Sequence, residues 1–167
     1  MQQEKIELNE LTLVGLSIRT NNSNERDPKK SKISVLANHY WAHHLSQNIA
    51  HRQNPGVTYS AYTAYESDEY GDYTYFIGEA VNSLDNQPFP EFNSLIIPRS
   101  AYQKFTTPMG AMPDIIIQAW QIIWQMPLTD LGGKRQYITD FEVYDERARN
   151  PQKAIADIYI GIHSSKT

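Results

Sequence analysis

Tyrosines and one carboxylate form the most informative pattern in this sequence. Six tyrosines lie close together, at positions 59, 62, 65, 70, 73 and 75. The segment from Tyr137 to Tyr144 returns to this composition and places Glu142 among aromatic residues. Ring faces attract cations, and a nearby acid supplies the opposite charge, so this combination suits a flat organic cation. The pattern therefore indicates a binding site for a cationic small molecule.

The position of Glu142 within its segment leaves two interpretations open. In a strand, alternation places Phe141 and Val143 on one face and Glu142 and Tyr144 on the other. We expect the first face to belong to the core. The second face would point to water in many proteins. The alternative is a carboxylate partly desolvated among rings, which is costly when unpaired and for which a cationic ligand supplies the missing charge.

Other aromatic residues are candidates for the walls of such a site. Trp120 and Trp124 lie four residues apart on a predicted helix, where they would provide broad apolar contact. Ring faces and hydroxyl groups would come from Tyr59, Tyr75, Tyr102, Phe105 and Tyr144. The direction of these rings depends on the strand register, which the sequence does not fix.

Composition excludes several classes of protein. The chain has 167 residues and a net charge of -4, without the concentrated Lys and Arg of nucleic-acid binding, so direct contact with nucleic acid is not expected. It has no cysteine, which excludes disulfides and thiolate metal sites. His39 and His43 have metal-compatible spacing, but no third ligand is evident, so neither a metal nor a cofactor is expected. The sequence lacks a signal-peptide core and a membrane-spanning apolar run, which predicts a cytoplasmic protein.

The apolar pattern predicts two halves with the same order of elements. The first has a strand at residues 11–18, a helix at 33–49, and a hairpin of strands at 57–66 and 72–83. The second has a strand at residues 95–97, a helix at 113–126, and strands at 135–144 and 154–163. The order repeats after about 80 residues.

This repeat predicts an α+β fold built from duplicated β-α-β-β halves, at about residues 8–84 and 91–163, within a single domain of residues 1–167. The two halves would form an antiparallel sheet that carries two main helices, with a ligand groove at their junction.

Four segments resemble the GyrI-like effector-binding domain family: Tyr73–Gly78, Trp120–Trp124, Asp140–Arg147 and Ala156–Ile160. This family includes the ligand-binding domains of AraC-type and MerR-type transcription regulators and stand-alone, integron-associated effector-binding proteins. The resemblance extends from about Leu11 to Ile162. It implies a groove that binds cationic, amphipathic molecules, as in multidrug recognition. It also implies that Glu142 is the pocket acid, because it matches the glutamate of the Phe-Glu-x-Tyr segment.

Three functions follow from these observations. The favoured one is a stand-alone protein that binds cationic or lipophilic small molecules. Regulators of this type carry a helix-turn-helix ahead of the domain, whereas the first strand here is expected near residue 8, so direct transcriptional control by this chain alone is not expected. The second function is hydrolysis of reactive small molecules by Glu142 and a tyrosine, although no aligned nucleophile and base can be recognised. The third is an interaction subunit. A homodimer or a separate regulator stays open as a protein partner.

Overall fold

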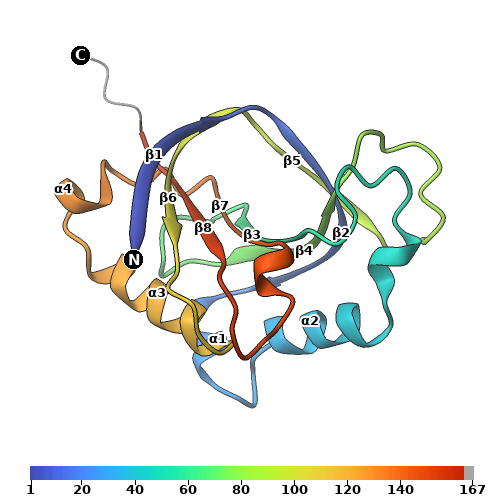
Figure 1. Cartoon of the computed structure of the whole chain (residues 1–167), viewed down its shortest axis with the longest axis horizontal. Coiled ribbons are helices and arrows are strands. Elements are labelled where there is room, and N and C mark those ends of the chain that lie inside the picture. Colours follow the sequence, from blue (N-terminus) through green and yellow to red (C-terminus); the bar gives the residue numbers. More distant parts are fainter. Residues whose placement is uncertain (164–167) are drawn as a thin grey trace.

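Eight antiparallel strands form one continuous sheet in the computed structural model, which describes residues 1–163 (Figure 1). The order across the sheet is β1-β6-β8-β7-β3-β4-β2-β5. The strands are β1 (Gln2–Leu8), β2 (Leu11–Thr20), β3 (Thr58–Thr63), β4 (Tyr73–Ala80), β5 (Asn93–Ile97), β6 (Ser100–Thr106), β7 (Thr139–Tyr144) and β8 (Asp157–Gly161).

The two longest helices lie along one side of this sheet, below it in Figure 1. The helices are α1 (Asn22–Arg26), α2 (Ile33–Ala42), α3 (Asp114–Gln125) and α4 (Leu128–Leu131), and short 3-10 turns occur at Leu45–Asn48 and Glu146–Ala148. No helix in the described part of the chain has the length and apolarity that crossing a membrane requires.

The predicted duplication is confirmed by the order of the elements. The first half is β2-α2-β3-β4 and the second is β6-α3-β7-β8. The halves meet at the centre of the sheet, where β3 pairs with β7. In that pairing Ser60 lies opposite Glu142, and Tyr62 lies opposite Asp140. The junction therefore brings the tyrosine-rich hairpin beside the strand that carries the acid.

Each main helix covers the sheet of its own half. Residues of α3 such as Ala119 and Ile123 pack with Phe105 and Ile158 in one cluster of buried residues. Residues of α2 and the following turn pack on β2 and β4 in a second cluster, in which Tyr40 is almost fully buried. The third cluster, on the opposite face of the sheet, consists of strand residues alone.

Two strands were absent from the prediction. The apolar run near Leu95 belongs to β5, which pairs with β2 of the first half, and the second half begins instead with β6. Strand β1 lies at an edge of the sheet, and five of its seven residues are exposed. An edge strand with an exposed surface does not need the apolar alternation that identifies a strand in a sequence, so β1 gave no signal.

The first predicted helix is shorter than expected, and a further short helix, α1, lies between the first predicted strand and this helix. Helix α2 ends at Ala42 rather than near residue 49, because His44 adopts a left-handed conformation with φ of 49°. Leu45 and Ile49 are nevertheless buried in the same cluster, which is why the apolar spacing continues past the end of the helix. Helix α1 lies within residues 21–28, where the Asn21 side chain accepts a hydrogen bond from the backbone of Asn24.

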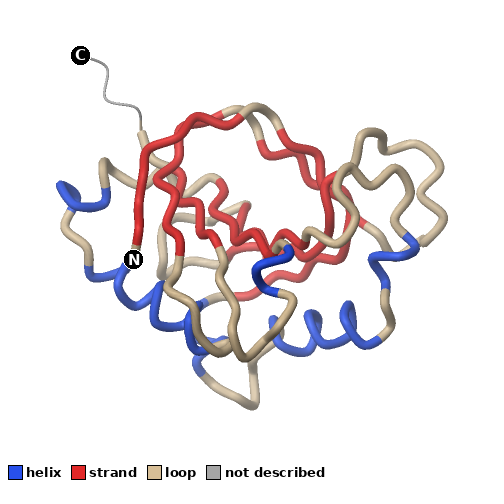
Figure 2. The backbone as a smooth tube through the Cα atoms, in the orientation of Figure 1, coloured by secondary structure: helices blue, strands red, loops and turns tan. Residues whose placement is uncertain are grey.

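A two-stranded ribbon arches over the face of the sheet that carries no main helix (Figure 2). Short bends at residues 9–10 and 98–99 connect β1 to β2 and β5 to β6. Strands β1 and β6 pair with each other, as do β2 and β5. The ribbon therefore consists of two chain segments, β1–β2 and β5–β6, that run side by side across both halves. The arrangement leaves two different surfaces on the sheet, one facing the helices and one facing the ribbon.

Candidate functional site

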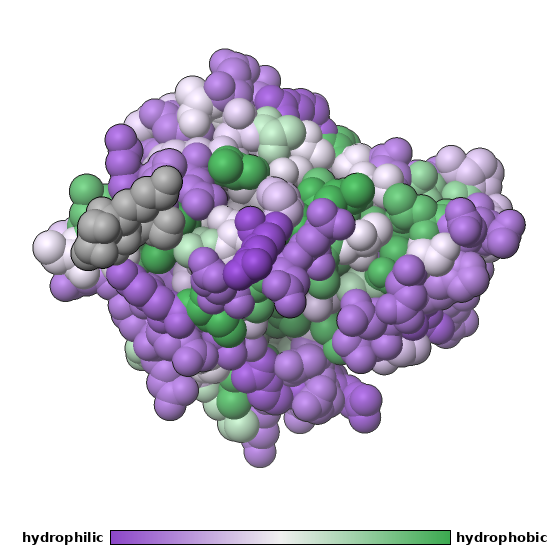
Figure 3. Space-filling model, turned by 90° about the horizontal axis from the view of Figure 1, so that it is seen from above, coloured by the Kyte–Doolittle hydropathy of each residue, from purple (hydrophilic) through white to green (hydrophobic). Residues whose placement is uncertain are grey.

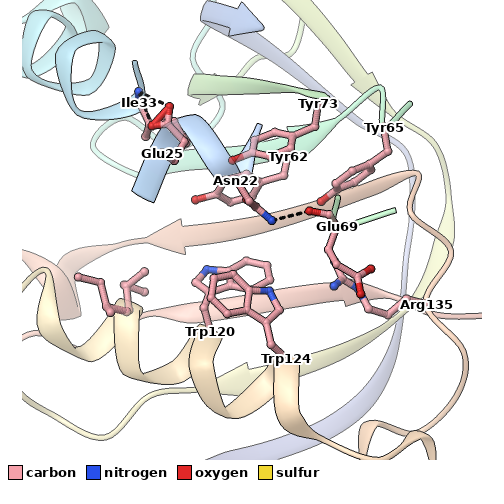
Figure 4. A pocket seen from close by; sticks show the side chains of 12 residues that line it. Asn22, Glu25, Ile33, Tyr62, Tyr65, Glu69, Tyr73, Trp120, Trp124 and Arg135 are labelled. Atoms are coloured by element: carbon pink, nitrogen blue, oxygen red, sulfur yellow. Dashed lines mark hydrogen bonds between the residues drawn. The ribbon is translucent and has the colours of Figure 1, made fainter. Parts of the chain in front are cut away.

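A cleft of about 270 Å³ lies at the junction of the halves, on the helix side of the sheet. Trp120 and Trp124 of α3 form one wall, and tyrosines of the β3–β4 hairpin form the opposite wall (Figure 4). The first turns of α1 and α2 and the segment before β7 complete the lining. The lining residues are Asn22, Glu25, Ile33, Tyr62, Tyr65, Glu69, Tyr73, Ile116, Ile117, Trp120, Trp124 and Arg135.

The aromatic rings of the cleft pack against one another in a continuous set. The Tyr62 ring meets the Trp120 ring nearly edge to face, with centroids 5.5 Å apart and an interplanar angle of 76°. Tyr73 lies 5.7 Å from Tyr62 on the sheet side, and Trp124 lies 6.0 Å from Trp120 along the helix. These contacts restrain the rings, so the walls are shaped before a ligand arrives.

Glu142 lies directly behind this wall, and its carboxylate accepts three hydrogen bonds. The Trp120 Nε1–H and the Tyr62 hydroxyl donate to Oε2 over 2.7 and 2.9 Å, and the Tyr144 hydroxyl donates to Oε1 over 2.5 Å. Glu142 is only 3% exposed. Of the two interpretations that the sequence leaves open, the structure agrees with the desolvated carboxylate, and three neutral donors satisfy it.

The pKa of Glu142 is raised by burial, which disfavours its charged form. The hydrogen bonds from Tyr144, Trp120 and Tyr62 act in the opposite direction because they stabilise the carboxylate. Burial is the larger effect. The free energy of the charged form is therefore higher than in water, and a nearby positive charge would lower it.

Two further carboxylates lie in the lining of the cleft. Glu25 accepts hydrogen bonds from the backbone N–H groups of Lys32 and Ile33, at 2.8 and 3.2 Å, which places its charge at the N-terminus of α2. Glu69 accepts a hydrogen bond of 2.6 Å from the Tyr137 hydroxyl. Both carboxylates keep their place through contacts with the protein, and both add negative charge to the cleft.

One arginine also reaches the cleft, but its charge is paired. Arg135 Nη2 lies 2.7 Å from Oδ2 of Asp140, whose side chain is fully buried. Asp140 also accepts hydrogen bonds from the Tyr65 hydroxyl over 2.7 Å and from the backbone N–H of Gly161 over 2.8 Å. The pair therefore fixes the segment before β7 against the sheet and contributes little net positive charge to the cleft.

Comparison with known proteins identifies the family. The model of the integron-associated effector-binding protein family matches residues 6–162. The chain belongs to this family. YobU, a candidate transcriptional regulator of Bacillus subtilis (strain 168), is 31% identical over 148 residues, which cover 89% of each chain.

Solved structures of similar proteins share the fold of this effector-binding family member. An integron cassette protein from the mobile metagenome of Vibrio cholerae is 26% identical, with a TM-score of 0.73 over 96% of this chain and 95% of the other. SAV2435, solved with tetraphenylphosphonium bound, is 18% identical, with a TM-score of 0.77 over 98% of this chain and 95% of the other.

The structure separates the aromatic residues that the sequence singled out in this family member. Trp120 and Trp124 line the cleft, and Tyr144 bonds to the acid behind it. Tyr75 lies on the same face of the sheet, 5.6 Å from the Tyr62 ring, where it shares a 3.1 Å hydrogen bond with Ser60. The remaining three residues do not reach the cleft: Phe105 is fully buried under α3, and Tyr59 and Tyr102 lie on the ribbon side of the sheet.

Several residues of the cleft were missed by the sequence reasoning. Tyr62, Tyr65 and Tyr73 belong to the tyrosine-rich segment, but only the strand register shows that they face α3. The acids Glu25 and Glu69 come from a short helix and a loop. No local pattern could have identified these two acids, because their approach to the cleft depends on the docking of distant segments.

Proposed function

We propose that this protein binds organic cations with large apolar or aromatic groups in the cleft between α3 and the β3–β4 hairpin. The observation that carries the proposal is the burial of Glu142 without a counter-cation. Its three partners are neutral donors. Among residues 1–163, no lysine, arginine or histidine forms an ion pair with it. A bound cation would supply the compensating charge.

The walls of the cleft favour a cation over a neutral molecule of the same shape. Each tyrosine or tryptophan face in contact with the ligand would contribute about 0.5–2 kcal/mol of cation–π attraction. The negative charges of Glu142, Glu25 and Glu69 add Coulomb attraction, which is stronger in a partly desolvated cleft than in water. A neutral analogue gains the apolar contact alone. The site would therefore select its ligands by their positive charge more than by their shape.

Two further observations support this function. SAV2435, which shares the fold, was solved with tetraphenylphosphonium, an aromatic cation. In this protein a second hollow of about 390 Å³ adjoins the cleft and shares Asn22, Glu69, Trp124 and Arg135 with it. A ligand larger than the cleft can therefore extend beyond Trp124 without displacing the sheet.

A matched pair of ligands tests the proposal. Methyltriphenylphosphonium and triphenylphosphine oxide have nearly the same shape, but only the first is charged. We expect the parent protein to bind the cation at least about tenfold more tightly, a difference of about 1.4 kcal/mol, in calorimetric titrations. Glu142→Gln should remove most of this preference and leave the affinity for the oxide within about twofold of the parent.

Glu91→Gln is the matched control, since the Glu91 side chain is 64% exposed and does not line the cleft. This variant should bind both compounds as the parent does. Equal affinity of the parent protein for the cation and the oxide would end the proposal. An unchanged cation preference in Glu142→Gln would remove Glu142 from it.

A further inference from the structure

A separate hollow, lined by aromatic rings, lies on the face of the sheet opposite the cleft, between the sheet and the ribbon. Its volume is about 310 Å³. Leu8 and Leu11, at the bend between β1 and β2, form the ribbon side. Rings from β3, β6, β7 and β8 form the sheet side: Tyr59, Tyr102, Phe141 and Tyr159. The hollow lies back to back with the cleft, because Phe141 and Glu142 are neighbours on β7 and point to opposite faces.

Three of the four rings surround the fourth, Phe141. Tyr159 stacks on Phe141 with centroids 4.7 Å apart and an interplanar angle of only 12°. Tyr102 meets Phe141 edge to face at 5.3 Å, and Tyr59 lies 6.0 Å away with a tilt of 42°. The stacked pair turns two ring faces to each other, so a ligand in the hollow would meet ring edges there and the tilted rings at the sides. This geometry suits a planar ligand.

Three phenol groups in the hollow make no hydrogen bond to another side chain of residues 1–163. Among the described residues, no side-chain hydrogen bond involves the hydroxyl of Tyr59, Tyr102 or Tyr159, and none of the three belongs to the fully buried atoms without a partner, so water or a ligand can reach them. Burial raises the pKa of Tyr102 and of Tyr159 to about 12, so both hydroxyls remain neutral donors at physiological pH. A ligand with a carbonyl or ether oxygen would satisfy them.

The charge of this hollow differs from that of the cleft. Within the described chain, Glu10 is the one charged residue in its lining, and Glu10 is exposed at the bend of the ribbon. Seen from the ribbon side, the surface carries small hydrophobic groups separated by hydrophilic residues (Figure 3). A protein partner normally covers a larger continuous apolar patch. The volume of the hollow, its rings and its three phenol hydroxyls fit a small molecule instead.

We propose that this hollow is a second binding site, for neutral planar aromatic molecules of about two fused rings that carry a hydrogen-bond acceptor. The site does not depend on cation binding in the cleft, because it uses different residues on the other face of the sheet. Both sites could be occupied at once.

The test uses a neutral, solvent-sensitive naphthalene ketone, 6-propionyl-2-(dimethylamino)naphthalene. Its emission should shift to the blue when it is titrated with the protein, with one molecule bound per chain. Val143→Trp places a large ring in the hollow and should weaken binding of the probe at least tenfold. Tyr102→Phe removes one hydroxyl and should weaken it about threefold to tenfold. Trp124→Ala, in the cleft, should leave probe binding unchanged.

Excess methyltriphenylphosphonium should also leave the probe bound, and Val143→Trp should still bind this cation. If Val143→Trp does not fold, as judged by its melting temperature, Tyr159→Leu removes the stacked ring and replaces it in the test. The proposal is overturned if the parent protein does not bind the probe up to its solubility limit. It is also overturned if Trp124→Ala abolishes binding of the probe, or if binding requires a dimer seen by light scattering. A third contrary result would be that Tyr102→Phe and Val143→Trp, or Tyr159→Leu in its place, both bind the probe as the parent does.

Discussion

Trp120 connects the wall of the cleft to the buried charge of Glu142. Its ring lines the cleft, while its Nε1–H donates to Oε2 of Glu142 over 2.7 Å. A ligand that moves this ring would weaken one of the three hydrogen bonds that stabilise the carboxylate. Ligand contact and the protonation of Glu142 are therefore linked through Trp120, and in the same way through Tyr62, which also lines the cleft and donates to Oε2.

Replacing Trp120 with phenylalanine should raise the pKa of Glu142 further. The phenylalanine ring keeps an aromatic wall but lacks the N–H donor, so the carboxylate loses one stabilising hydrogen bond. A hydrogen bond to a charged group contributes about 1.5–3 kcal/mol, so the pKa should increase by about one to two units. The pH midpoint of cation binding, measured by calorimetry, should rise accordingly.

Trp124→Phe is the matched control for this prediction. It removes the same part of a ring from the cleft, but Trp124 makes no hydrogen bond to Glu142. Its cation affinity should fall by a similar factor at high pH, while the pH midpoint should stay at that of the parent. The same midpoint shift in both variants would contradict the role given to the Trp120 N–H.

Cation affinity should weaken as pH falls through the raised pKa of Glu142. Below that pKa the carboxyl group is protonated, so the charge that attracts the ligand is lost, whereas above it the affinity should reach a plateau. Calorimetry with methyltriphenylphosphonium between pH 4 and 8 would show this loss on the acid side. Triphenylphosphine oxide should bind equally across the range, and a parallel loss for both compounds would point to a change in the fold instead.

The repeat and both main helices could be predicted from the sequence because each helix buries an apolar stripe. Strands β1 and β6 could not. The residues of β1 are mostly exposed, and its place is set by pairing with β6, which comes about 90 residues later in the chain. The end of α2 at Ala42 depends on one left-handed residue, His44, to which apolar spacing is insensitive.

The candidate site could be named only in part, because single-residue register decides which ring faces the helix. Tyr59 and Tyr62 are three residues apart on β3 and therefore point to opposite faces. Tyr102 and Phe105 are separated in the same way on β6. Choosing between the members of each pair requires knowing which side α3 covers. The sequence gives the spacing of the aromatic residues along each strand but not the face of the sheet on which α3 lies.

Removing the cation of the Arg135–Asp140 pair should destabilise the fold. In Arg135→Met the fully buried Asp140 would keep two hydrogen bonds but lose its counter-charge. Breaking one side of a buried ion pair costs about 3–5 kcal/mol, which urea denaturation would measure. Arg99→Met is the control, because Arg99 and its partner Glu7 are both largely exposed. Its cost should be below about 1 kcal/mol. Similar costs for the two variants would contradict this account.

Gly78 of β4 should tolerate no side chain. It pairs directly with Gly15 of β2, and a Cβ added at Gly78 would overlap the carbonyl of Val14 in the neighbouring strand backbone. Because the overlapped atoms belong to the backbone of β2, room for the methyl group requires β2 and β4 to move apart, and β4 also carries Tyr73 of the cleft. Gly78→Ala should therefore cost about 3 kcal/mol or more in the free energy of unfolding.

Gly56→Ala provides the comparison, because Gly56 has a positive φ of 96° but no heavy atom within 4 Å of an added Cβ. It should lose only the cost of a left-handed alanine, about 1–2 kcal/mol. Urea denaturation of both variants separates steric overlap from backbone strain, since the two substitutions add the same methyl group. A smaller loss of unfolding free energy in Gly78→Ala than in Gly56→Ala would show that β2 and β4 can separate where Gly15 and Gly78 pair. Strand β4, which carries Tyr73, would then be a less rigid wall of the cleft than this close pairing indicates.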